Sequence, residues 1–142
     1  MQYIILALSL LCMSAMANAQ CDKKVTWYAS KLEATDSTGR VLDTIEDELL
    51  IIIKKDEILL QQPSDERNNL HAAIKETICN WEQPYKKGRS FYKVVFSKEN
   101  GDTSPGTLAV EIKDGAIVIN VFIEKVNETA HLTISKYKEE AL

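Results

Sequence analysis

The chain has 142 residues and a formal net charge of −4, and its acidic and basic residues are interspersed. Binding to nucleic acid or to an anionic membrane surface calls for a clustered basic face, so this charge pattern argues against both kinds of partner. The length is enough for one domain with a modest hydrophobic core.

An apolar segment opens the chain. Residues 3–17 are almost wholly apolar, and no charged side chain lies within or before them. A membrane-spanning helix needs about 20 apolar residues, and this run is shorter. The small residues Ala17 and Ala19 have the spacing that signal peptidase accepts. We therefore predict a signal peptide over residues 1–19, cleavage after Ala19, and a single secreted or periplasmic domain over residues 20–142 without a membrane span.

Two other interpretations of this segment stay open. Met1 and Gln2 carry no positively charged side chain, which a signal peptide usually has, so an uncleaved anchor is one alternative. Cys21 lies just beyond the apolar run, where a bacterial lipoprotein would carry its lipid. Gln20 stands where lipid attachment needs a small residue, and Asn18 stands where it usually needs Leu. A lipid anchor at Cys21 is therefore the less favoured alternative.

Cysteine pairing follows from the predicted compartment. Cleavage removes Cys12 and leaves Cys21 and Cys79, an even number in an exported domain. An oxidising compartment favours a bridge between them, which stabilises the fold by about 4 kcal/mol in the chain-entropy model. The alternative is a thiol nucleophile or a metal ligand. Neither cysteine belongs to a Cys-x-x-Cys motif, so a structural disulfide is the prediction.

The first part of the domain has the composition of β-strands. Runs rich in β-branched and apolar residues, separated by turn residues, cover 25–34, 48–54 and 57–62. The last two form a predicted hairpin. An acidic cluster precedes the second run: Asp43, Glu46, Asp47 and Glu48. It lacks the Asp-x-Asp-x-Asp-Gly pattern of a calcium loop, so we interpret it as a solvated loop.

Residues 64–81 fit two different structures. Behind Ser64 as an N-cap, the residues at helical spacing are Leu70, Ala73, Ile74, Thr77, Ile78 and Trp81. Read as a strand, the same segment alternates except at Glu76. The rest of the domain is a meander of strands, and residues 77–81 have strand composition. We therefore favour a strand over about 70–81, and we allow at most one short helix, over residues 64–80.

The segment 81–89 is the best candidate for a contact with another protein. It combines two aromatic and three basic side chains on what we predict to be a long exposed loop, and functional contacts concentrate on such loops. A plain hairpin loop is the simpler interpretation. The candidate contact residues are Trp81, Tyr85, Lys87 and Arg89.

Four further strands complete the chain, over 90–97, 107–113, 116–124 and 130–137. Asn100-Gly101 and Asp114-Gly115 are strong hairpin signals, because a type I′ turn needs positive φ at both central residues. Alternation along these runs places apolar side chains on one face of each strand. His131 alternates with Leu132, so we expect His131 to face the solvent.

These elements predict a mostly β fold: an antiparallel up-and-down meander of seven or eight strands that forms a closed or nearly closed barrel. The number and order of the strands, a Trp on the first strand and a stapled N-terminus resemble the lipocalin-like (calycin) barrels. In lipocalins this Trp belongs to a Gly-x-Trp motif, and an Arg near the last strand packs over it. Here Val25 takes the Gly position before Trp27, and residues 134–138 contain no Arg.

Two functions are expected from this reading. The resemblance implies a non-enzymatic binding protein whose barrel interior holds one small apolar ligand, and the alternative is a structural or protein-interaction module of the cell envelope or the extracellular space. Catalytic and nucleotide-binding motifs do not occur, and His71 has no partner at metal-ligand spacing, so we expect neither a cofactor nor a metal. The predicted ligand-binding residues are Trp27, Tyr92, Phe96 and Val110.

Overall fold

The computed structural model describes residues 21–141, which form one antiparallel sheet of nine strands. A turn of 3-10 helix, η2 (Glu66–Asn68), lies between β4 and β5. The predicted signal peptide over residues 1–19 lies outside the described residues. The strands are β1 (Lys24–Thr35), β2 (Val41–Ile45), β3 (Leu49–Ile53), β4 (Glu57–Gln61), β5 (Leu70–Gln83), β6 (Lys87–Ser97), β7 (Thr103–Lys113), β8 (Ala116–Ile123) and β9 (Glu128–Glu140).

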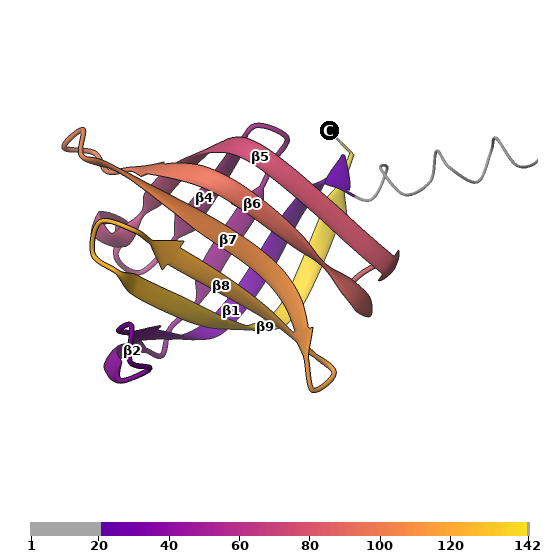
Figure 1. Cartoon of the computed structure of the whole chain (residues 1–142), viewed down its shortest axis with the longest axis horizontal. Coiled ribbons are helices and arrows are strands. Elements are labelled where there is room, and N and C mark those ends of the chain that lie inside the picture. The colour runs from indigo at the N-terminus through magenta and orange to yellow at the C-terminus, as the bar shows by residue number, and fades with distance from the viewer. Residues whose placement is uncertain (1–20, 142) are drawn as a thin grey trace, which may run out of the picture.

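The sheet closes on itself into a barrel. From β3 to β9 each strand pairs with the next one along the chain, and β1 pairs with both β3 and β9 (Figure 1). The β1–β9 ladder runs from Lys24↔Glu140 to Thr35↔Thr129. Eight strands therefore share a continuous wall, and β2 is attached to it as a ninth. This confirms the predicted closed meander, whose general shape is consistent with a lipocalin-like barrel.

Strand β2 corrects the interpretation of the acidic segment as a loop. β2 pairs with the second half of β1, from Leu32↔Ile45 to Thr35↔Val41, whereas β3 pairs with the first half. Only the connection between β2 and β3, residues 46–48, is a loop. The strand could not be recognised from alternating hydrophobicity because Val41 and Leu42 are both exposed. Within residues 21–141, β2 pairs with β1 alone.

The ambiguous segment is a strand, as favoured. β5 pairs with β4 on one side and with β6 on the other. The β5–β6 register shifts between Ile74 and Glu76, which marks a bulge. An extra residue in one strand moves the following side chains to the opposite face. This explains why the alternation fails at Glu76, and why helical spacing matched the sequence equally well.

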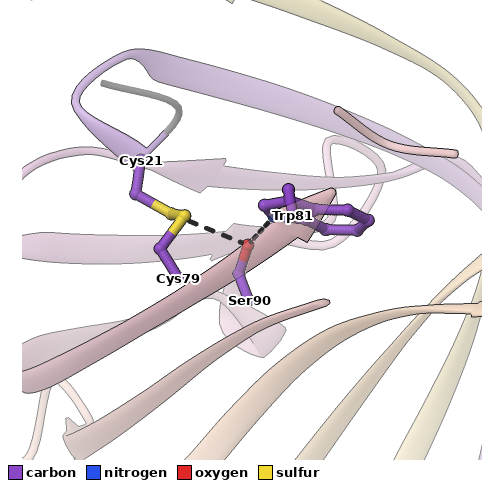
Figure 2. The surroundings of a disulfide bond; sticks show 4 residues. All are labelled: Cys21, Cys79, Trp81 and Ser90. Carbon is purple, nitrogen blue, oxygen red and sulfur yellow. Dashed lines mark hydrogen bonds between the residues drawn. A yellow bond between two sulfur atoms is a disulfide. The ribbon is translucent and has the colours of Figure 1, made fainter. Parts of the chain in front are cut away.

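The predicted disulfide Cys21–Cys79 is present, with 6.2 Å between the two Cα atoms. The bridge ties the segment that precedes β1 to strand β5. Figure 2 shows Ser90 beside the bridge. The Trp81 indole N–H donates to Ser90 Oγ at 2.6 Å, and Ser90 Oγ lies 3.9 Å from Cys21 Sγ. A bridged sulfur has no hydrogen, so the Ser90 hydroxyl donates to it.

Candidate functional site

The two ends of the barrel differ. The β3–β4, β5–β6 and β7–β8 turns lie at one end with the start of β1 and the end of β9, and we call this the closed end. The opposite end, the open end, carries the β1–β2, β4–β5, β6–β7 and β8–β9 connections. Loops at the mouth of a barrel are a common place for a ligand site. The two ends also differ in packing and in internal space.

Aromatic side chains fill the closed end. The Tyr85 ring contacts Trp27, Trp81 and Tyr137, with ring centroids 4.9, 5.4 and 4.9 Å apart. Trp27 also packs on Tyr137 at 5.2 Å. Burial raises the pKa of Tyr85, and the neighbouring Glu139 carboxylate raises it further, so the Tyr85 hydroxyl stays neutral. Tyr85 and Tyr137 thus cover Trp27, where the lipocalin resemblance would place an Arg.

The four predicted ligand-binding residues belong to this filled part of the interior. Trp27, Tyr92, Phe96 and Val110 are all buried. Trp27 and Tyr92 border a cavity of only about 10 Å³, which is the size of one water molecule. The Phe96 ring lies so close to Gly106 that a Cβ there would approach it to 2.5 Å. These side chains belong to the packed core, and a ligand-binding role for them stays a prediction.

The predicted long loop at 81–89 is wrong as a structure. β5 continues to Gln83 and β6 begins at Lys87, so only residues 84–86 form the turn. Trp81 is buried, and Tyr85 has a positive φ of 56° that directs its ring back over the barrel end. Lys87 pairs with Glu82 at 2.8 Å, and Arg89 pairs with Glu111 at 3.8 Å. A protein contact through these residues stays a prediction.

An apolar cavity of about 200 Å³ lies inside the open end, and we call it the open-end cavity. It forms where β2 leaves the barrel wall: β4 pairs with β3 but ends at Gln61, before it reaches the level of β2. Its lining is almost entirely aliphatic. The lining residues are Leu32, Ile45, Leu49, Leu50, Ile51, Leu60, Gln61, Gln62, Asn68, Leu70, Ile123, Ala130 and Leu132.

The open-end cavity continues into a wider groove of about 790 Å³ between the open-end loops, which we call the rim groove. Asn68, Leu70 and Ile123 border both spaces. The rim groove therefore adjoins the cavity, and we interpret it as the route from solvent. Its remaining walls come from the β4–β5, β6–β7 and β8–β9 connections and from the first residues of β7 and β9: Arg67, Asn69, Lys98, Glu99, Asn100, Asp102, Thr103, Ser104, Lys125, Val126 and Glu128.

Four polar side chains hold the β4–β5 loop over the cavity, and we call them the latch: Asp47, Gln62, Ser64 and Asn68. Asp47 Oδ2 accepts from Gln62 Nε2 at 3.1 Å and from the Ser64 hydroxyl. Asn68 Nδ2 donates to Gln62 Oε1 at 2.7 Å. The Gln62 side chain is buried, and both of its polar ends are bonded. The latch thus joins the β2–β3 connection to the β4–β5 loop.

The latch depends on an ionised Asp47. Hydrogen bonds from Ser64, Gln62 and the Glu48 amide lower the pKa of Asp47 below its usual value. Because the folded-state pKa lies below the unfolded one, the latch contributes its full stability above about pH 4. That stability is lost as the pH falls through the folded-state pKa of Asp47.

Asp47→Asn is expected to loosen the β4–β5 loop, because an amide nitrogen cannot accept the hydrogen bonds that the carboxylate accepts. Hydrogen exchange at neutral pH, corrected for intrinsic rates, should be faster at residues 62–69 than in the wild type. Asp43→Asn is the control, since the exposed Asp43 side chain accepts only from the adjacent Thr44 amide among the described residues. Equal exchange at residues 62–69 in the two variants would contradict the latch.

The two histidines lie on the outer wall. His71 Nε2 is 2.8 Å from Glu57 Oε2, and His71 Nδ1 is 3.4 Å from Ser97 Oγ. These are the residue types of a catalytic triad, but β5 is paired on both sides, so its amides are not free to bind an oxyanion. His131 lies on the outer face but is half-buried, with Nδ1 2.7 Å from Asn120 Oδ1.

Because comparisons with known proteins found no match, the candidate site is assigned from its geometry. The chain matches no protein-family model and no curated protein sequence. Among residues 21–141 there is no group of three or more His, Cys, Asp or Glu side chains that could hold a metal ion. Within the same residues, no helix has the length and apolarity needed to cross a membrane. The open-end cavity was missed from the sequence because its residues come from seven strands and the β4–β5 connection.

Proposed function

We propose that this protein is an exported binding protein that holds a small apolar molecule in the open-end cavity. The observation that supports this proposal most strongly is the cavity itself, an aliphatic space of about 200 Å³ that reaches solvent through the rim groove. Transfer of a hydrocarbon group from water into such a space is favourable by about 0.8 kcal/mol per methylene. The proposed ligand site is therefore inside the barrel, as expected, but at the opposite end from Trp27.

Two further features support the proposal. Stable globular proteins leave few voids larger than a water molecule in their interiors, so a cavity of this size inside a small barrel calls for an occupant. The Cys21–Cys79 disulfide fits an extracellular or periplasmic protein, because such bridges persist in oxidising compartments. Export follows from the predicted signal peptide over residues 1–19.

Ala130→Phe is expected to abolish the binding of 1-octanol, measured by isothermal titration calorimetry. Ala130 lies on β9 and lines the cavity, and it shares the inward face with the buried Leu132. A phenyl ring at this position would occupy much of the space. The filled cavity should also leave the variant as stable to heat as the wild type, or more stable, because the new ring gains contacts without displacing packed atoms.

Thr133→Phe is the matched control, because Thr133 is exposed on the outer face of the same strand. It should bind 1-octanol as the wild type does. Octanol binding that survives Ala130→Phe would overturn the proposed site. A complete absence of octanol binding by the folded wild-type protein would overturn the proposed function.

A further inference from the structure

The chemistry of the open-end cavity and its rim restricts the occupant further. We infer that it is a molecule with one hydrocarbon group of about six or seven carbons and a head group without net charge. This inference rests on the proposed function. It is carried by three observations: the aliphatic lining of the cavity, in which the buried Gln62 amide is already bonded, the cavity volume, and the near balance of charge around the rim groove.

The buried part of the occupant has to be hydrocarbon. The most buried polar side chain of the cavity lining is Gln62, which is 8% exposed. Its amide nitrogen donates to Asp47, and its amide oxygen accepts from Asn68 at 2.7 Å. A polar group placed inside the cavity would therefore find no free partner on Gln62, and burying an unpaired polar group is costly. The head group accordingly stays in the rim groove.

The cavity volume limits the length of the inserted group. A methylene is close in size to a water molecule, whose share of liquid volume is roughly 30 Å³. The cavity volume of about 200 Å³ thus corresponds to about six or seven carbon atoms. Atoms beyond that length would lie in the rim groove, which is lined mainly by polar side chains and offers less apolar contact.

The charges around the rim groove are balanced. Three cationic side chains, Arg67, Lys98 and Lys125, face three anionic ones, Glu99, Asp102 and Glu128. Asp65, which accepts from Arg67 Nε at 2.8 Å and from its Nη2 at 2.9 Å, adds one more carboxylate, so the rim as a whole is close to neutral with at most a weak acidic excess. A charged head group would give up part of its hydration here without entering a field of the opposite sign. A neutral head group loses less hydration free energy on entering the rim groove, so it is preferred.

The test is a titration series with one chain length and three head groups: 1-octanol, octanoate and octylammonium at pH 7, by isothermal titration calorimetry. Octanol should bind at least about tenfold more tightly than either ion, a difference of about 1.4 kcal/mol. The two ions should differ from each other by less than about threefold, and added salt should not change octanol affinity. An ion that binds as tightly as octanol would overturn the inference and leave the proposed function standing.

The carbon number is tested with the 1-alcohols from butanol to decanol. Affinity should rise about fourfold per methylene up to six or seven carbons and then level off. A rise that continues unchanged to decanol would overturn the size limit. Lys98→Glu makes the rim strongly acidic: it should favour octylammonium over octanoate and leave octanol unchanged. A change in octanol affinity would show that the charge balance is not what selects the head group.

Discussion

Trp27→Ala is expected to lower the free energy of unfolding by about 3–5 kcal/mol, the usual cost of truncating a buried Trp. Trp27 is 2% exposed, and its ring packs on Tyr85 and Tyr137 at the closed end. The space around it is already filled, so the lost ring would leave a large void that its neighbours cannot close. Chemical denaturation of the purified domain, followed by circular dichroism, measures the change.

Two variants separate packing from hydrogen bonding at this position. The Trp27 indole N–H has no hydrogen-bond partner among the described residues, so Trp27→Phe gives up ring area but also removes an unpaired buried donor. We expect it to cost well under half as much as Trp27→Ala. Tyr28→Ala, on the outward face next to it, should cost less than either buried truncation. Losses of similar size in Trp27→Ala and Tyr28→Ala would contradict the packed closed end.

Removal of the disulfide is the second large effect. Cys21→Ala together with Cys79→Ala should lower the free energy of unfolding by about 4 kcal/mol, because the bridge closes a long loop and restricts the unfolded chain. The two cysteines are 58 positions apart in the sequence. For a domain of this size the expected fall in Tm is roughly 10–20 °C. Differential scanning calorimetry measures it directly.

The reduced wild-type protein is the internal control for the disulfide. A thiol reductant should lower the Tm of the wild type to that of the double variant and should leave the double variant unchanged. If the reductant lowered the Tm of both proteins by the same amount, the reductant would be acting on something other than the disulfide. A double variant as stable as the wild type would contradict a stabilising role for the bridge.

Much of the fold could be predicted because it depends on local patterns. The Asn100-Gly101 and Asp114-Gly115 turns and the alternating runs around them located β6 to β9. The ends of the strands were harder to predict. β7 begins at Thr103 and β9 continues to Glu140, because polar residues extend the hydrogen-bonded ladder there. A pattern of alternating hydrophobic residues does not reveal that such polar residues belong to a strand. β2 was missed for the same reason, since its side chains are mostly exposed.

The site was harder to predict because it depends on where the wall of the barrel is incomplete. The sequence favoured the aromatic residues around Trp27, which are large and apolar, but size and hydrophobicity describe a packed core equally well. The open-end cavity exists because β2 replaces β3 along the second half of β1 and β4 stops at Gln61. That arrangement follows from strand register, which no local pattern encodes.

The most direct test of a ligand site at the open end is a nuclear Overhauser experiment on the isotope-labelled protein with 1-octanol. We expect contacts from the octanol chain to the methyl groups of Ile45, Leu70 and Leu132, which line the open-end cavity. No contact is expected to Val110, which is buried in the packed core. Contacts to Val110, or an octanol that contacts none of the three cavity residues, would contradict the proposed site.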